Sequence, residues 1–278
     1  KIKTSPSTYE LGFIFGPKIN AGGRLGHSNY GTKLLSTNDH DEANFLSYKL
    51  TSLNEKRKKF EDISLSKIIK EAEFQKKDPI IVLYNKDLHE GVLGILASRI
   101  KDKFYKPTFI LSGLKNNIKA SARSTYGFDI GKAILNLMKQ KIILSGGGHK
   151  MAGGFTIEKK KIHLLKKIIT DIFLKNNKND YIFNEIYADA IILPTAVNEK
   201  FYDDINLMSP FGAGNKEPFF IIENLKIFKF KIIQNKHVSL ILISKDKKII
   251  NCISFNAINS ELHNYLLNYK KPIDIIGK

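Results

Sequence analysis

The stretch that decides the fold is Ser145-Gly146-Gly147-Gly148-His149-Lys150-Met151-Ala152-Gly153-Gly154, in which five of ten residues are glycine. Glycine has no side chain, so backbone N–H groups in such a stretch can approach a ligand closely. We expect a loop that cradles a phosphate, with Gly146, Gly147, Gly148 and Lys150 contacting the anion. Its spacing differs from that of the Walker and dinucleotide-binding motifs.

His149 stands among these glycines, where little crowds its ring. An imidazole in such a place can donate to a phosphoryl oxygen or assist a leaving group, so we interpret His149 as a catalytic candidate. The alternative is an ordinary hydrogen-bonded histidine.

Around this stretch, short apolar runs alternate with helical patterns across residues 76–178. The runs are residues 80–84, 108–111, 118–121 and 155–157, and the helical patterns are residues 91–103, 129–139 and 159–175. Such alternation predicts an α/β domain with a central sheet.

A single long helix is predicted over residues 38–75, ahead of this domain. Asp39-His40-Asp41 fits helix capping rather than metal binding, because acidic groups stabilise a helix start. Lys56, Arg57, Lys58 and Lys59 are expected on a solvated face. The expected apolar stripe consists of Leu46, Leu50, Leu53, Phe60 and Ile63.

A second domain is predicted over residues 179–278, after the polar run 176–180. It begins with a short helix near residues 198–208 and a turn-rich segment. Serial short strands with turn residues between them indicate a small antiparallel barrel. The expected strands are residues 219–222, 225–233, 237–243, 249–255 and 273–276.

Three further motifs carry candidate binding residues. Ser121 and Arg123 are two apart on an expected strand, so both point to one side and can clamp a phosphate. Asn20 and Arg24 lie in the polar, glycine-rich segment 17–26, which we interpret as a turn. His89 precedes an expected helix start that can receive an anion. The alternative for each motif by itself is a purely structural role, which fits Ser121 and Arg123 better when they are taken alone.

The charge favours a polyanionic partner, with a formal net charge of +18 and a pI near 9.7. A general lysine bias accounts for it equally well. Only four of the 45 basic residues are arginine, namely Arg24, Arg57, Arg99 and Arg123. Because guanidinium binds oxyanions in a bidentate fork, these four positions are singled out. No apolar run approaches the roughly 20 residues of a membrane span, and the one cysteine, Cys252, suits a reducing compartment.

Taken together and in this order, these motifs resemble the RecJ family of the DHH phosphoesterase superfamily. Residues 1–37 look like the end of the DHH domain, residues 38–75 like its connecting helix and residues 76–178 like its DHH-associated domain. Residues 207–218, Leu-Met-Ser-Pro-Phe-Gly-Ala-Gly-Asn-Lys-Glu-Pro, resemble the entry to the oligonucleotide-binding (OB) barrel, which would occupy residues 179–278.

The resemblance implies a cytoplasmic 5′-to-3′ exonuclease for single-stranded DNA, acting in repair and recombination with two Mn²⁺ or Mg²⁺ ions. It implies that Ser121 and Arg123 hold the 5′-phosphate and that His149 contacts a phosphate near the metals. The partners that it implies are single-stranded DNA with a 5′ end, a single-strand-binding protein and a helicase.

The sequence departs from the family pattern in lacking the Asp-rich motifs and the His-His pair that bind the metals. We therefore expect a chain that begins partway through a longer protein and is inactive by itself. Two alternatives stay open. One is a DHH-type phosphodiesterase for short oligonucleotides or cyclic dinucleotides. The other is a non-catalytic single-strand-binding remnant.

Overall fold

The computed structural model describes residues 6–176, 187–212, 214–258, 260–268 and 271–278, which belong to two compact units. One unit comprises Tyr9–Asn184, and the other comprises Lys1–Thr8 with Glu185–Lys278. Within the described residues, no helix is long and apolar enough to cross a membrane.

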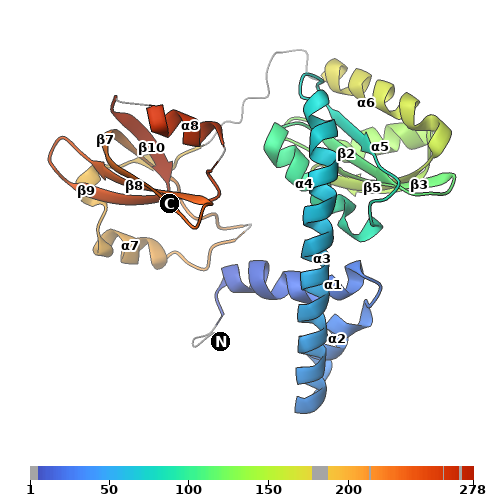
Figure 1. Cartoon of the computed structure of the whole chain (residues 1–278), viewed down its shortest axis with the longest axis horizontal. Coiled ribbons are helices and arrows are strands. Elements are labelled where there is room, and N and C mark those ends of the chain that lie inside the picture. Colours follow the sequence, from blue (N-terminus) through green and yellow to red (C-terminus); the bar gives the residue numbers. More distant parts are fainter. Residues whose placement is uncertain (1–5, 177–186, 213, 259, 269–270) are drawn as a thin grey trace. The chain divides into compact units, whose positions relative to one another are not determined.

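The first unit is organised along α3, which runs from His40 to Phe74 (Figure 1). Its first turn is capped by Asp39, whose Oδ1 accepts hydrogen bonds from the backbone N–H groups of Asp41 at 2.8 Å and Glu42 at 3.2 Å. The capping interpretation of this acidic segment is confirmed, because the carboxylate satisfies donors that have no partner within the helix.

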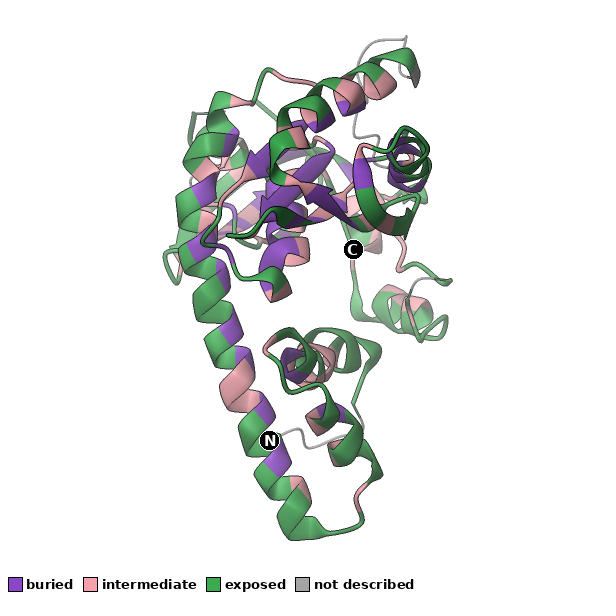
Figure 2. Ribbon diagram, turned by 90° about the vertical axis from the view of Figure 1, so that its right-hand side faces the viewer, coloured by how far each residue is buried: buried purple, intermediate pink, exposed green. Residues whose placement is uncertain are grey.

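The buried stripe of α3 differs from the expected one. Leu46 and Leu50 are buried, but Phe60 and Ile63 are 46% and 56% exposed, so their expected burial was wrong. The stripe continues instead through polar residues, because α4 supplies a polar partner on that side. Arg57 is one of them, so its expected place on a solvated face was wrong, whereas Lys56, Lys58 and Lys59 are exposed. Figure 2 shows this stripe as a buried line along the helix. Its members are Leu46, Leu50, Asn54, Arg57, Glu61, Ser64, Ile68 and Ala72.

Three short helices precede α3, namely the π-helix η1 (Glu10–Phe15), α1 (Gly16–Arg24) and α2 (Asn29–Ser36). The turn predicted over residues 17–26 was wrong, since most of that segment is α1. Pro17 is tolerated because it stands in the first turn. Gly22 is explained chiefly by the chain after α1, because a β-carbon there would lie 2.5 Å from the carbonyl oxygen of His27. It would also lie 3.2 Å from Cδ2 of Leu50 on α3.

The sheet of this unit has the order β1-β2-β3-β5-β4. Its strands are β1 (Ile81–Tyr84), β2 (Thr108–Ser112), β3 (Asn117–Arg123), β4 (Ile143–His149) and β5 (Ala152–Glu158). Only β1 and β2 are parallel, and they are joined through the 3₁₀-helix η2 (Glu90–Val92) and α4 (Leu93–Phe104). The predicted α/β domain with a central sheet is confirmed.

The two faces of this sheet are covered unequally. On one face, α5 (Ile130–Lys139) and α6 (Ile162–Asn176) enclose a continuous apolar core with all five strands. On the other face, α3 and α4 pack against apolar residues of β1 and β2. On this second face, the part formed by β4 and β5 carries exposed residues, including Gly147, His149 and Gly154.

The glycine-rich stretch is not a loop, contrary to expectation. It forms the hairpin of β4 and β5, with Gly147 paired to Gly154 and His149 paired to Ala152. Only Lys150 and Met151 form the turn. The glycines therefore lie in extended, paired strands rather than in a loop that wraps around an anion.

The second unit is a curled antiparallel sheet with a small apolar core. Its sheet order is β10-β7-β8-β9, with β6 paired to β7 in parallel. The two strands predicted over residues 219–233 are one strand, β7, with Asn224 at a positive φ of 63°. The first half of β7 pairs with β10 and the second with β8, as in a sheet that curls toward a barrel. The elements are β6 (Ala190–Ile191), the 3₁₀-helix η4 (Pro194–Ala196), α7 (Glu199–Asn206), β7 (Phe220–Ile233), β8 (His237–Ile243), β9 (Ile249–Ser254), α8 (Glu261–Asn268) and β10 (Ile273–Gly277).

Candidate functional site

The strand register brings several predicted site residues onto one face of the sheet. Ser121, Gly154 and Gly147 occupy one row across β3, β5 and β4. Arg123, Ala152 and His149 occupy the adjacent row. Ser121 and Arg123 therefore point to the same side, as predicted, because side chains alternate along a strand.

The side chain of Arg123 is held by hydrogen bonds to residues of its own strand, β3. Its Nη1 donates to the carbonyl oxygen of Ala122 at 2.8 Å and to Oγ of Ser121 at 3.4 Å. Burial, together with the nearby positive charge of Arg24, lowers the pKa of the Arg123 guanidinium. Both effects disfavour a cation, so a bound anion would relieve them.

Arg24 reaches this place from the end of α1. Its Nη1 donates to the carbonyl oxygen of Gly91 at 3.2 Å. Asn20 lies one turn earlier on α1, so the helix presents both predicted residues on one side. The structure thus brings Arg24, Ser121 and Arg123 together from segments about 100 positions apart in the sequence.

The four arginines divide into two pairs with opposite surroundings. Glu61 joins Arg57 and Arg99, with Oε2 2.9 Å from Nη1 of Arg57 and Oε1 3.1 Å from Nε of Arg99. Within the described residues, neither Arg24 nor Arg123 has a carboxylate partner. Two converging guanidinium groups with no carboxylate form a site suited to an oxyanion.

Gly91, just before α4, and Gly94, within α4, leave space for the side chains of this site. A β-carbon at Gly91 would collide with the carbonyl oxygen of Arg24. A β-carbon at Gly94 would lie 2.8 Å from Nη2 of Arg123 and 3.2 Å from Oγ of Ser121. Side chains at these two positions would separate α1 from η2 and fill the space next to Arg123.

His89 has a capping role in this arrangement. Its Nδ1 accepts a hydrogen bond from the backbone N–H of Gly91 at 3.1 Å, at the start of η2. Its ring is stacked with Phe60 of α3, with centroids 6.0 Å apart. His89 therefore fixes the turn that carries the Gly91 carbonyl, and Arg24 binds that carbonyl.

His149 is exposed at the end of β4, two strands away from Arg123. Two inter-strand spacings separate the two backbones by roughly 10 Å. Nδ1 of His149 accepts from the backbone N–H of Met151 at 3.4 Å. A neutral imidazole that accepts through Nδ1 carries its proton on Nε2, so His149 can donate to a ligand on the open face.

Sequence reasoning did not name Gly94 or Lys119 as site residues, and it included Gly154 only as part of the glycine-rich stretch. Lys119 continues the alternation of Ser121 and Arg123 along β3, and its Nζ donates to Oγ1 of Thr156 at 3.1 Å. The alternation itself could have identified Lys119. Nothing in the local sequence distinguishes Gly94 or Gly154 from other glycines, because their importance depends on distant segments.

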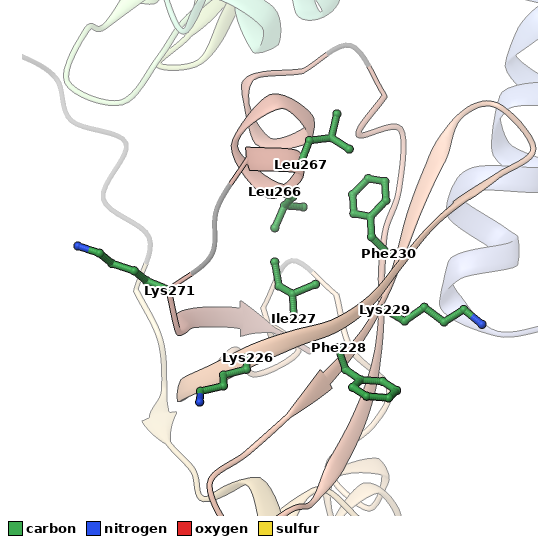
Figure 3. A pocket seen from close by; sticks show the side chains of 8 residues that line it. All are labelled: Lys226, Ile227, Phe228, Lys229, Phe230, Leu266, Leu267 and Lys271. Atoms are coloured by element: carbon green, nitrogen blue, oxygen red, sulfur yellow. The ribbon is translucent and has the colours of Figure 1, made fainter.

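A second candidate surface lies on the other unit, between β7 and α8. Apolar side chains gather in a hollow of about 440 Å³, and the amino groups of three lysines extend away from it (Figure 3). Phe228 is 70% exposed beside them. Cations with exposed aromatic rings suit a single nucleic-acid strand. The hollow is lined by Lys226, Ile227, Phe228, Lys229, Phe230, Leu266, Leu267 and Lys271.

The side chains that could bind a metal ion are scattered over the described ranges. These ranges contain no group of three or more His, Cys, Asp or Glu side chains arranged to hold a metal ion. A divalent metal ion therefore does not fit the donors that this part of the chain presents.

Comparison with known proteins identifies both units. A DHHA1 domain model matches residues 77–175, and a RecJ OB domain model matches residues 188–278. The single-stranded-DNA-specific exonuclease RecJ of Haemophilus influenzae is 31% identical over 264 residues, which are 91% of this chain and 46% of that protein. The Escherichia coli protein of the same name is 27% identical, over 84% of this chain and 42% of that protein.

A solved structure has the same fold as this chain. The crystal structure of RecJ in complex with Mn²⁺ from Thermus thermophilus superposes with a TM-score of 0.81 at 23% identity. The match covers 99% of this chain and 39% of that one. The chain thus spans less than half the length of the relatives that it matches.

Proposed function

The chain belongs to the RecJ family, and on that premise we propose that it forms the DNA-binding part of a single-strand-specific exonuclease that degrades DNA from the 5′ end. The first unit binds the 5′-terminal phosphate, and the OB unit guides the strand. Hydrolysis, and any role in repair and recombination, belongs to the longer protein. No catalytic metal is assigned to the described residues, because their donors do not fit one.

One observation carries this proposal, namely the convergence of Arg24 and Arg123 beside Ser121 without a carboxylate. A terminal phosphate monoester carries between one and two negative charges near neutral pH, whereas an internal phosphodiester carries one. Two guanidinium groups therefore favour the strand end over internal phosphates. This preference gives the enzyme its polarity.

His149 is proposed to act on the next phosphate of the bound strand. The face between Arg123 and His149 is formed by residues with small side chains or none, namely Ala152, Gly154 and Gly147. With the 5′-phosphate at Arg123, the Nε2–H of His149 is placed to donate to an oxygen of the following phosphodiester.

The test is a binding measurement on the 278-residue chain with fluorescently labelled single strands. We expect a 5′-phosphorylated strand to bind roughly tenfold or more tightly than a 5′-hydroxyl strand, because a charge-assisted bidentate contact is worth about 1.5–3 kcal/mol. Arg123→Ala should abolish this difference while 5′-hydroxyl strands bind nearly as before. Equal affinity of the wild-type chain for both strands would overturn the proposal.

A phosphodiesterase for short oligonucleotides or cyclic dinucleotides is the weaker alternative. Residues 188–278 match the RecJ OB domain, and binding of such a short substrate does not need this second domain. A binding-only remnant would use the same residues. It is distinguished by the absence of DNA hydrolysis in the longer gene product.

A further inference from the structure

Phe60 is an aromatic residue that α3 exposes rather than buries. It lies outside the buried stripe of that helix. Its ring is nevertheless stacked on the ring of His89, with 8° between the two planes and 6.0 Å between the two centroids. Burial in a core therefore does not explain an aromatic side chain at this position, whereas the contact with His89 does.

His89 is an unusual residue for the position that it occupies. It is the N-cap residue of η2, where its Nδ1 accepts a hydrogen bond from the backbone N–H of Gly91 at 3.1 Å. Serine, threonine, aspartate and asparagine are the common residues at such a position, and they are smaller. These shorter side chains have no flat ring. Histidine fits here because one side chain both caps η2 and stacks on Phe60 of α3.

Gly91 connects this stacked pair to Arg24. The carbonyl oxygen of Gly91 accepts a hydrogen bond from Nη1 of Arg24 at 3.2 Å. A β-carbon at Gly91 would collide with the carbonyl oxygen of Arg24 and would lie 3.1 Å from Nδ1 of His89. The turn at Gly91 thus lies against the main chain of Arg24 and also binds its guanidinium.

The guanidinium of Arg24 depends on such support. An arginine side chain has many rotamers, and holding it in one of them costs conformational entropy. Its place near Arg123 also brings two like charges together, and burial and the charge of Arg24 both lower the pKa of the Arg123 guanidinium. A carbonyl group at a fixed position therefore stabilises an arrangement that the two charges by themselves oppose.

We propose that Phe60 and His89 are positioning residues that hold Arg24 in place for the 5′-phosphate. Phe60 fixes the ring of His89, and His89 fixes the turn at Gly91. The Gly91 carbonyl then fixes the guanidinium of Arg24. This inference rests on the proposed function and deepens it, since it makes the strength of the phosphate contact depend on a side chain of α3 that does not touch the phosphate.

The test uses the full 278-residue chain and single strands that carry either a 5′-phosphate or a 5′-hydroxyl. His89→Ala removes the cap and the ring, and it should weaken binding of the phosphorylated strand roughly fivefold while the hydroxyl strand binds nearly as before. His89→Asn restores a cap without the ring and should recover part of that loss.

Phe60→Leu keeps an apolar side chain but removes the stacked ring. It should weaken binding of the phosphorylated strand roughly threefold. Phe45→Leu is the matched control, because Phe45 is also exposed on α3 but lies roughly 22 Å further along the helix. Its affinity for both strands should equal that of the wild-type chain.

Dependence on Arg24 distinguishes a positioning role from a general loss of structure. In the Arg24→Ala background, the preference that remains comes from Arg123 and Ser121. His89→Ala and Phe60→Leu should cause no further loss there, because the group that they position is gone. A purely structural role would weaken binding of both strands by equal factors, with and without Arg24.

The outcomes separate this inference from the proposed function. If the wild-type chain prefers phosphorylated strands and the His89 and Phe60 variants keep the full preference, the positioning role is refuted and the proposed function stands. Equal losses for both strands, or an undiminished loss in the Arg24→Ala background, also refute it. If the wild-type chain shows no preference, the proposed function fails first. Phe60→Leu changes an exposed side chain, so it decides the matter even if His89→Ala does not fold.

Discussion

At the scale of single residues, the four arginines show how the same side chain serves two purposes. Arg57 and Arg99 share the carboxylate of Glu61 and join α3 to α4. In the part of the chain that the structure describes, Arg24 and Arg123 have no carboxylate partner, which leaves their charge for a ligand. The difference lies in the neighbours, because a guanidinium stays charged in either setting.

The geometry of Arg123, and not its charge alone, should determine preference for a 5′-phosphate. Arg123→Lys keeps the positive charge but loses the planar fork, so we expect the preference for phosphorylated strands to fall roughly tenfold. Arg99→Lys is the matched control, since that side chain is 64% exposed and away from Arg123. Anisotropy titrations with both strands measure the effect. Full retention of the preference in Arg123→Lys would show that charge suffices.

His149 should affect the rate of DNA hydrolysis rather than the affinity for DNA. If the proposed function holds, His149→Ala in an active protein that includes these 278 residues should lower turnover of single-stranded DNA by roughly 100-fold, as for loss of a proton or hydrogen-bond donor. His149→Gln keeps a donor near the position of Nε2 and should recover part of the rate. Single-turnover assays separate an effect on the rate of hydrolysis from an effect on DNA binding. Unchanged turnover in His149→Ala would leave the residue with a structural role.

Glu61 should be essential for stability, because it neutralises a buried cation. The side chains of Arg57 and Glu61 are 10% and 7% exposed. Glu61→Ala leaves Arg57 buried without a counter-charge and should lower the free energy of unfolding by about 3–5 kcal/mol. Glu55→Ala, on the exposed side of the same helix, is the control. Urea denaturation provides the measurement, and a loss below about 1 kcal/mol would contradict the prediction.

At the scale of elements, the neighbouring helices and strands determined the conformation of segments whose sequence pattern was ambiguous. Two successive glycines in residues 17–26 favour a turn by local propensity, yet most of the segment is α1, and Gly22 lets the backbone at His27 lie close against the end of this helix. The glycine-rich hairpin is extended for a similar reason, since Gly146 and Gly153 allow α5 to pack on it. In both places glycine permits close packing rather than a turn.

The register of α3 can be tested with two isoleucines on the same helix, one buried and one exposed. Ile68 is fully buried and Ile63 is 56% exposed. Ile68→Ala should therefore cost about 2–5 kcal/mol of unfolding free energy, while Ile63→Ala should change it by about 0.5 kcal/mol or less. Chemical denaturation of both variants distinguishes this register from the predicted stripe, which contained Ile63. Equal losses would contradict the buried stripe described here.

At the scale of the whole molecule, the proposed function predicts that the 278-residue chain binds DNA without hydrolysing it. The described residues supply cations, hydroxyls and an imidazole donor, but no cluster of metal ligands. The net charge of +18 adds sequence-independent affinity for a strand. A chain with these properties should bind single-stranded DNA without cutting it.

This separation gives a direct prediction. The purified 278-residue chain with Mn²⁺ or Mg²⁺ should release no nucleotides from a single strand that it binds, because no metal-activated water can form on the described donors. Calorimetric titration with Mn²⁺ should likewise show no tight site. A longer RecJ protein under the same conditions is the positive control. Metal-dependent degradation by the chain itself would refute the prediction.

Amino-acid sequence alone sufficed to predict the α/β domain, the long helix with its Asp39 cap, the strand-rich second domain and the alternation of Ser121 with Arg123. These features depend on periodicity and capping, which act over a few residues. Only the tertiary structure decided which arginines lack a carboxylate and which glycines face the open side of the sheet. Those properties depend on atoms brought together from distant segments, as when α1 places Arg24 beside Arg123. Local sequence does not contain that information.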